Sequence, residues 1–274
     1  MAARARTAQP RRTRAPVGVH PTAIVHPKAV LASGVRIGPY TVIGEHVSIG
    51  PGTQVGAHCV LEGYTTIGAD CEIFTGAVIG SMPQDLKYRG EKSLLVIGDR
   101  NKIREYVTIN PGTEGGGGKT VIGSNCLLMA YAHVAHDCLI GNHVVIANSA
   151  ALAGHILIED RAVVGGLVGI HQFVRVGTLS IIGGCSRVIQ DVPPYATCVG
   201  YPAKVFSLNT EGLRRAGVSQ DAKEHLHHAF KVLFRSKLSM GHAVKQIAEE
   251  TDHCAEVQHL LGFIRDSKRG VCRA

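Results

Sequence analysis

Aliphatic side chains recur at every sixth position of this chain from Val19 to Val188. The pattern runs in three blocks, which begin at Val19, Ile97 and Ile122, and it comprises 26 hexads. A helix would space its apolar residues three and four apart, and an amphipathic strand would alternate them. A period of six instead predicts a strand of about four to five residues followed by a turn, with three such units closing a triangular coil. Such a chain is a solenoid, whose repeats bury their apolar faces by stacking.

Two further features of the hexads are typical of a narrow prism. The fifth residue is usually small, and it is cysteine at Cys59, Cys71, Cys126 and Cys138. Side chains from three walls converge on one axis, so we interpret these cysteines as buried small hydrophobes. Gly follows the aliphatic residue in twelve hexads, which suits a tight corner or a close approach of two backbones. None of the eight cysteines forms a C-x-x-C pair, and a reducing cytoplasm is expected.

The repeat, assigned to residues 17–202, is interrupted twice. Excursions are expected at about 81–96, where two aliphatic positions are missing, and at 110–121, where the phase shifts by one residue. Excursions from a solenoid tend to be surface loops and often carry function. The Gly-rich run in the second excursion lacks a nucleotide-binding motif, so it is predicted to be a flexible loop. Pro193 and Pro194 are expected to stop strand pairing.

Beyond the coil, residues 203–274 are predicted to form a small C-terminal helical domain. Ser219 and Ser239 are expected to cap two helices, and Asp252 is expected to cap a third that extends through Lys268. This unit is too thin to be stable alone. We therefore expect it to pack on the coil or on a neighbouring subunit.

Positive charge gathers at the two ends of the chain, whose formal net charge is +8. Residues 1–16 carry five Arg and no acidic residue, and they lack the apolar spacing of an amphipathic helix. They are predicted to be a basic disordered tail rather than an organelle-targeting segment. The basic C-terminal part would suit an acidic partner or phosphates, or it is a solvated surface. No apolar run reaches transmembrane length.

Candidate chemistry gathers in the third block. His133, His136 and Asp137 lie in one coil, and His155 follows 19 residues after His136. Because stacked coils bring residues about 18 apart into contact, His136 and His155 are expected to face the same groove. Imidazole suits a general base near neutral pH, and Asp137 could orient it. Gly154 is open enough to supply a backbone N–H to an oxyanion.

The same cluster has a second interpretation as a metal site, since hexapeptide coils hold zinc in the γ-class carbonic anhydrases. The γ-class signature resembles a His five residues from its partner, with a third His about two coils earlier. Here His133 and His136 are three apart, and His155 follows one coil later. We therefore expect neither a metal nor another cofactor. For isolated histidines outside the cluster, a solvated or edge position is the simpler interpretation.

Eight segments together resemble one enzyme family. They are QDLKY (84–88), GDRNKIRE (98–105), HVAHDCLIGN (133–142), LAGH (152–155), HQF (171–173), GGCS (183–186), QDVPPY (190–195) and NTEGLRR (209–215). Over residues 17–274 the chain resembles the UDP-N-acetylglucosamine O-acyltransferases, which open lipid A biosynthesis. The resemblance implies a left-handed parallel β-helix of hexapeptide repeats with a C-terminal α-helical domain. General connection rules alone would favour a right-handed crossover.

The resemblance also implies roles for individual residues. His136 looks like the general base on the glucosamine 3-hydroxyl, with Asp137 as its partner and Gly154 as the oxyanion donor. Asp85 and Lys87 look like sugar and phosphate contacts, and a lysine point charge suits a diphosphate. Four residues look like further groove contacts: His133, His155, His171 and Gln172.

The family is a homotrimer with active sites between prisms, and some implied contacts come from a neighbouring subunit. Three residues look like contacts to the uridine and phosphate groups of the substrate: Asn209, Glu211 and Arg215. Gly184 occupies the position that sets acyl length, and a glycine there implies a chain of about twelve to fourteen carbons. The implied donor is a 3-hydroxyacyl-acyl carrier protein, whose acidity matches the basic C-terminal part. Ala216 departs from the family, which often has Arg there.

Other acyl transfers and other classes of protein compete with this interpretation. Tyr201 and Pro202 replace polar residues that some members of the family place near the acyl or nucleotide site. Some members acylate a 3-amino sugar and make an amide, and nothing in the sequence excludes that acceptor. A sister N-acyltransferase family carries an extra N-terminal uridine-binding domain, for which a repeat that begins at Val19 leaves no room. A purely structural solenoid would not explain the eight segments.

Overall fold

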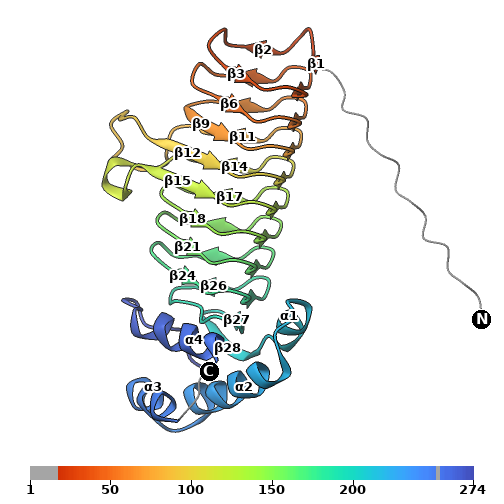
Figure 1. Cartoon of the computed structure of the whole chain (residues 1–274). Helices are drawn as coiled ribbons and strands as arrows, with labels where there is room; N and C mark the ends of the chain where they lie inside the picture. Colours follow the sequence, from red (N-terminus) through yellow and green to blue (C-terminus); the bar gives the residue numbers. More distant parts are fainter. Residues whose placement is uncertain (1–17, 251–253) are drawn as a thin grey trace, which may run out of the picture.

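The structure, a computed structural model, describes residues 18–250 and 254–274; the tail predicted at 1–16 lies outside them. Stacked coils form a tall three-sided prism, and helices cover its C-terminal end (Figure 1). Each side of the prism is a sheet of parallel strands, in which a strand pairs with the strand three positions further along the chain. The aliphatic residues of successive coils are in register, as in the pairing of Ile37 with Val55. The six-residue period therefore produces the triangular coil that it predicts.

Over the described part of the chain, the three sheets differ in the number of strands that they contain. The first has eleven: β1 (Gly18–Val19), β4 (Arg36–Ile37), β7 (Gln54–Val55), β10 (Glu72–Ile73), β13 (Lys102–Ile103), β16 (Leu127–Leu128), β19 (Val145–Ile146), β22 (Val163–Val164), β25 (Ile181–Ile182) and the antiparallel pair β27 (Ala196–Gly200) and β28 (Ala203–Leu208). The second has nine: β2 (Ile24–Val25), β5 (Val42–Ile43), β8 (Val60–Leu61), β11 (Val78–Ile79), β14 (Thr108–Ile109), β17 (His133–Val134), β20 (Ala151–Leu152), β23 (Gly169–Ile170) and β26 (Arg187–Val188). The third has eight: β3 (Val30–Leu31), β6 (Ser48–Ile49), β9 (Tyr64–Ile67), β12 (Leu94–Ile97), β15 (Lys119–Ile122), β18 (Leu139–Ile140), β21 (Leu157–Ile158) and β24 (Arg175–Val176).

The strands are shorter than predicted, because the corners use more of each hexad. Most coil strands contain two residues, and β9, β12 and β15 contain four. The third residue after the aliphatic one turns the chain in the left-handed conformation, as at Tyr40 and Leu167, both with a φ of 57°. That conformation costs roughly 1–2 kcal/mol for a residue with a Cβ. The stacking of every coil on its neighbours compensates for this cost.

The core is the column of inward aliphatic side chains along the prism. Ile79, Ile109 and Leu128 are fully buried, whereas Val19, in the first described coil, is 42% exposed. The glycine after the aliphatic residue allows successive corners to approach closely. A Cβ at Gly38, for example, would lie 2.6 Å from the carbonyl carbon of Gly56, so no larger residue fits there.

The four cysteines at the fifth hexad position are buried, as predicted. Burial raises the pKa of the Cys126 thiol to about 11 and that of Cys138 to about 12. Each thiol donates to a carbonyl oxygen of the neighbouring coil, as Cys138 does to Ala153 across 3.2 Å. These thiols are therefore protonated at neutral pH, and they are satisfied within the core.

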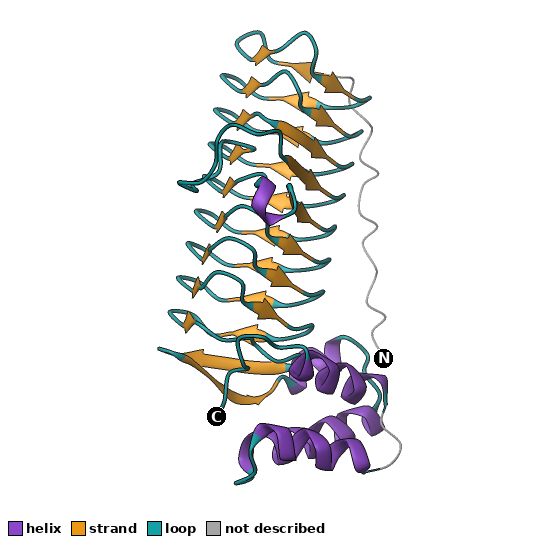
Figure 2. Ribbon diagram, turned by 90° about the vertical axis from the view of Figure 1, so that its left-hand side faces the viewer, coloured by secondary structure: helices purple, strands orange, loops and turns teal. Residues whose placement is uncertain are grey.

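Two loops leave the prism at neighbouring heights on one side (Figures 1 and 2). The first loop, residues 80–93, joins β11 to β12, and the second, residues 110–118, joins β14 to β15. The second contains the 3₁₀ helix η1 (Glu114–Gly116). The backbone of Leu94 accepts from the N–H of Gly112 at 3.2 Å and donates to the carbonyl of Gly118 at 2.8 Å. The Gly-rich run that we predicted to be flexible is thus tied to β12 near both of its ends.

The C-terminal part is helical and packs on the last coils (Figure 2). Its helices are α1 (Thr210–Arg215), α2 (Gln220–Arg235), α3 (Met240–Glu249) and α4 (Ala255–Arg265). The caps predicted at Ser219 and Ser239 are confirmed, since their hydroxyls accept from the backbone N–H of Ala222 and His242.

The helices differ from the sequence-based predictions in two places. The third predicted helix, α4, has Cys254 at its N-cap and ends at Arg265 rather than Lys268. Its predicted cap, Asp252, lies outside the described residues. The side chain of Cys254 makes no capping hydrogen bond. The sequence also gave no signal for α1, whose six residues are fewer than two helical turns.

Candidate active site

The candidate residues lie in stacked corners between the second and third sheets. Asp137 and His155 occupy the left-handed position of their corners, with φ values of 58° and 60°. Phe173 occupies the same position one coil further on, with a φ of 66°. The N–H of His155 donates to the carbonyl of His136 at 3.0 Å, and the N–H of Phe173 donates to that of Gly154 at 3.2 Å. The regular turn of the repeat therefore positions this column of side chains.

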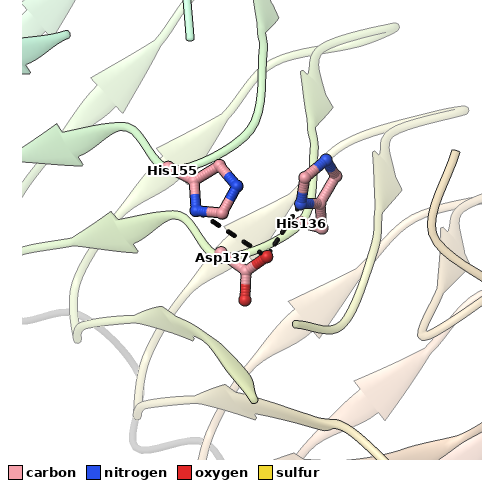
Figure 3. Close-up of side chains that lie close together, drawn as sticks. All are labelled: His136, Asp137 and His155. Carbon is pink, nitrogen blue, oxygen red and sulfur yellow. Dashed lines mark hydrogen bonds and ion pairs between the residues drawn. The ribbon is translucent and has the colours of Figure 1, made fainter. Parts of the chain in front are cut away.

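His136 and Asp137 form a buried hydrogen-bonded pair (Figure 3). The Nδ1 of His136 lies 2.8 Å from Oδ2 of Asp137, and the two residues are 7% and 5% exposed. Because a carboxylate can only accept, Nδ1 carries the proton, and Nε2 of the neutral ring has a free lone pair. The ring of His155 meets that of His136 edge-on with centroids 5.0 Å apart, and its Nδ1 is 3.9 Å from Oδ2 of Asp137.

Gly154 lies directly against the imidazole of His136. A Cβ at this position would be 2.5 Å from Cε1 and 2.7 Å from Nε2 of His136. Any side chain at residue 154 would therefore push the ring away from its present position. The contact brings the backbone of Gly154 beside the nitrogen that we expect to act as the base.

Predicted site residues from distant parts of the chain line one groove beside this pair. The groove is bordered by the first loop, by η1 and by the corners of three coils. Its predicted members are Asp85, Lys87, His133, His136, Gly154, His155, His171 and Gln172. Within the first loop, Oδ1 of Asp85 accepts from the N–H of Lys87 at 3.0 Å. Asp137 lies behind His136 rather than on the wall of the groove.

Burial favours the neutral form of two further imidazoles in the groove. It lowers the pKa of His133, and the nearby His136 lowers that pKa further. Burial also lowers the pKa of His155, an effect that Asp137 opposes. The Nδ1 of His133 is hydrogen-bonded to the Thr108 hydroxyl at 2.7 Å. Neutral rings of this kind can donate or accept a hydrogen bond without adding positive charge to the site.

Three predicted contacts lie on or beside α1, outside the groove of their own chain. The side chain of Asn209 accepts from the N–H of Gly212, and its amide donates to the carbonyl of Leu179. Glu211 accepts from the guanidinium groups of Arg214 and Arg215. Arg214 contributes most to lowering the pKa of Glu211 to about 2.

Gly184 also lies away from the groove of its own chain. It follows β25, at a corner between the first and second sheets, whereas His136 is at a corner between the second and third. A Cβ at Gly184 would lie 3.3 Å from the carbonyl oxygen of Gly166 and would otherwise meet little. Within one chain, the residue expected to set acyl length and the expected base therefore occupy different edges of the prism.

Sequence reasoning missed several residues that contact the site. Phe173 stacks on His155 with ring centroids 4.5 Å apart, and its spacing of 18 residues from His155 would have revealed it. Thr113 donates two hydrogen bonds to Asp137, and Arg269 donates to Nδ1 of His171 at 3.2 Å. No periodic signal could have found Thr113 or Arg269, because both lie outside the hexads.

The cluster also contains the donors of a possible cation site. Ligand atoms of His136, Asp137 and His155 all lie within 4.8 Å of one another. However, Oδ2 of Asp137 already accepts from Nδ1 of His136 and from the hydroxyl of Thr113. An ion bound here would have to displace these hydrogen bonds.

Comparisons with known proteins agree in one family. A family model described as UDP-N-acetylglucosamine O-acyltransferase, domain 2, matches residues 191–272, and a bacterial transferase hexapeptide model matches 119–154. The chain is 52% identical over 255 residues to the acyl-[acyl-carrier-protein]–UDP-N-acetylglucosamine O-acyltransferase of Myxococcus xanthus, covering 93% of this chain and 99% of the relative.

Solved structures give the same result. LpxA from Acinetobacter baumannii superposes with a TM-score of 0.90 at 44% identity, covering 93% of this chain and 99% of that one. The UDP-N-acetylglucosamine acyltransferase from Campylobacter jejuni gives 0.89 at 39% identity, with the same coverage. Among the described residues, no helix has the length and apolar character needed to cross a membrane. The predicted left-handed parallel β-helix is confirmed, and the chain belongs to the UDP-N-acetylglucosamine O-acyltransferase family.

Proposed function

We propose that this protein transfers a 3-hydroxyacyl chain from acyl carrier protein to the 3-hydroxyl of the glucosamine unit of UDP-N-acetylglucosamine. This reaction opens lipid A biosynthesis. The observation that carries the proposal is the buried pair of His136 and Asp137, with Nε2 free at the edge of a groove. The name of the Myxococcus xanthus relative and the description of the matching family model specify transfer to oxygen, so a hydroxyl acceptor is favoured over the amine of a 3-amino sugar.

The pair suits direct acyl transfer by general-base catalysis. Nε2 of His136 takes the proton of the sugar hydroxyl while its oxygen forms a bond to the thioester carbonyl carbon. The backbone N–H of Gly154 stabilises the oxyanion of the tetrahedral intermediate. The intermediate then expels the thiolate of acyl carrier protein, which receives the proton from His136. Asp137 stabilises the imidazolium between the two steps, so neither a metal nor a covalent enzyme intermediate is needed.

The rest of the groove supplies contacts to the nucleotide sugar and the acyl donor. Lys87 offers a point charge to the diphosphate, and Asp85 accepts from sugar hydroxyls. His133, His155, His171 and Gln172 offer hydrogen bonds along the groove. The lowered pKa values of His133 and His155 keep these rings neutral, so that each can donate to an oxygen and accept from a hydroxyl.

We further propose that the active enzyme is a homotrimer with its sites between prisms. Gly184 and His136 lie on different edges of one prism, so a second copy is required if both are to border one groove. Asn209, Glu211 and Arg215 would likewise reach the nucleotide of a neighbouring subunit. The basic C-terminal part would attract the acidic carrier protein. Because the proposed donor is an acyl carrier protein and the cysteines are free thiols, a cytoplasmic location is proposed.

The proposal is tested by incubating the protein with UDP-N-acetylglucosamine and 3-hydroxyacyl carrier proteins of several lengths, then weighing the products. A 3-O-acylated nucleotide sugar is the expected product, and His136→Ala should lower kcat by at least about 10². Near-normal turnover by that variant would exclude His136 as the base. Prior treatment with a chelator should leave the rate unchanged, whereas a loss restored by zinc would favour the metal-dependent alternative.

A further inference from the structure

A residue of the second loop holds the carboxylate beside the proposed base. Thr113 donates its backbone N–H to Oδ1 of Asp137 at 2.8 Å and its hydroxyl to Oδ2 at 2.7 Å. Oδ2 is the oxygen that also accepts from Nδ1 of His136. Both carboxylate oxygens are therefore occupied, and the group cannot rotate without breaking a bond to Thr113.

The loop also shields this carboxylate from water. Thr113 is 5% exposed, and the side chain of Asp137 is 1% exposed. The backbone of Gly116 lies against the carboxylate so closely that a Cβ at that position would collide with Asp137. A buried charge costs several kcal/mol unless it is hydrogen-bonded, so the bonds from Thr113 make the buried position of Asp137 tolerable.

The hydroxyl of Thr113 is directed at Asp137 rather than at its own loop. Thr113 precedes η1, where a threonine would ordinarily cap the first turn by accepting from a backbone N–H. It makes no such side-chain cap here. The loop itself is tied by backbone bonds to Leu94 of β12, so the prism fixes where the hydroxyl lies.

We infer that Thr113 is a positioning residue for acyl transfer, which acts through Asp137 to keep Nε2 of His136 directed at the groove. The inference rests on the proposed function, since it requires His136 to be the base. A general base must stay within hydrogen-bond reach of the proton that it removes. Loss of the Thr113 hydroxyl removes one hydrogen bond from Oδ2 of Asp137. The carboxylate can then rotate, and the imidazole of His136 can shift with the carboxylate.

The experiment compares Thr113→Val with two matched variants. Valine keeps the backbone N–H and the shape of the side chain but removes the hydroxyl, whereas Thr113→Ser keeps the hydroxyl. Thr120→Val is the control, because Thr120 is also buried, follows the same loop, and its hydroxyl has no hydrogen-bond partner among the described residues. We expect Thr113→Val to lower kcat about 10- to 100-fold with both KM values within about twofold. Thr113→Ser and Thr120→Val should stay within about threefold of the unsubstituted enzyme.

A double-mutant cycle separates positioning from a general structural role. If Thr113 acts through Asp137, Thr113→Val should lower kcat by less than about twofold in an Asp137→Ala background. An equal loss in both backgrounds would overturn the inference, and so would a Thr113→Val enzyme with normal kcat. If Thr113→Val does not fold, Thr113→Ala gives the same test, because it also removes the hydroxyl that donates to Oδ2 of Asp137 and keeps the backbone N–H that donates to Oδ1.

The outcomes also distinguish this inference from the proposed function. Absence of acyl transfer in the unsubstituted protein, or full activity of His136→Ala, would contradict the function itself. An active enzyme that requires His136 but tolerates Thr113→Val would contradict only the role of Thr113.

Discussion

A Cβ at Gly154 would lie 2.5 Å from Cε1 of His136, so the proposed base is held against a backbone that has no side chain. The two residues are 18 apart and meet because one corner stacks on the next. The glycine thus has a steric role in addition to the oxyanion role that we propose for its N–H.

Gly154→Ala should lower kcat by about 10², because the added methyl displaces the imidazole from the position where it can take the hydroxyl proton. The measurement is steady-state kinetics with both substrates varied. Gly262→Ala is the control, since a Cβ at Gly262, in α4, meets nothing within 4 Å. Normal kcat in Gly154→Ala would mean that the ring does not need its present position.

Asp137→Asn should lower kcat at least about 10²-fold, even though the shape of the side chain is preserved. Oδ1 accepts from the N–H of Thr113, and Oδ2 accepts from the Thr113 hydroxyl and from His136. If the amide nitrogen replaces Oδ1, it faces the backbone N–H of Thr113. If it replaces Oδ2, it donates to Nδ1 of His136, and the ring proton then lies on Nε2, which can no longer act as the base. The test measures kcat together with the melting temperature. Loss of activity without loss of folding is expected, and retention of activity would contradict the orienting role of Asp137.

His259 of α4 should make stability depend on pH. The hydrogen bond from Glu159, on the prism, raises the pKa of His259, and burial and, more weakly, Arg175 oppose this effect. The hydroxyl of Tyr195 lies 3.2 Å from Nδ1 of the ring. Because the folded state binds the proton more tightly than the unfolded chain, the stabilisation is fully present below a pH of about 6.5. It is lost as the pH rises through the higher pKa of the folded state.

His259→Gln should therefore lower the melting temperature more at pH 6 than at pH 9. The measurement is thermal unfolding of both proteins across that range. His227→Gln serves as a control, because His227 is an exposed residue of α2. An equal decrease at both pH values would show that the charged contact with Glu159 contributes nothing.

Gly184→Met should shorten the preferred acyl chain. The position has open space beyond the carbonyl of Gly166, so a methionine side chain would project from the corner into the end of the groove that we propose to lie between subunits. The measurement is kcat/KM for carrier proteins loaded with chains of about ten and fourteen carbons. We expect the ratio to move toward the shorter chain by at least about tenfold. An unchanged ratio would show that Gly184 does not determine the preferred length of the acyl chain.

The hexad period determined most of what lies within the coils. Residues in stacked coils lie about 18 positions apart in the sequence, so neighbours can be paired by counting. Counting assigned His136 and His155 to one groove, and it could also have placed Phe173 beside His155. The same counting predicted the buried cysteines. It did not predict the strand lengths, because the sequence pattern does not show how many residues of each hexad belong to the strand and how many to the left-handed corner.

Only the tertiary structure decided the contacts made by residues of the loops, which lie outside the six-residue repeat. Thr113 reaches Asp137 because the second loop folds back onto β12 through Leu94, and no period relates these positions. The sequence by itself therefore determined the prism and the His136 column, since local periodicity governs stacking. The two hydrogen bonds from Thr113 to Asp137 depend on where the second loop lies in space, and no period predicts that.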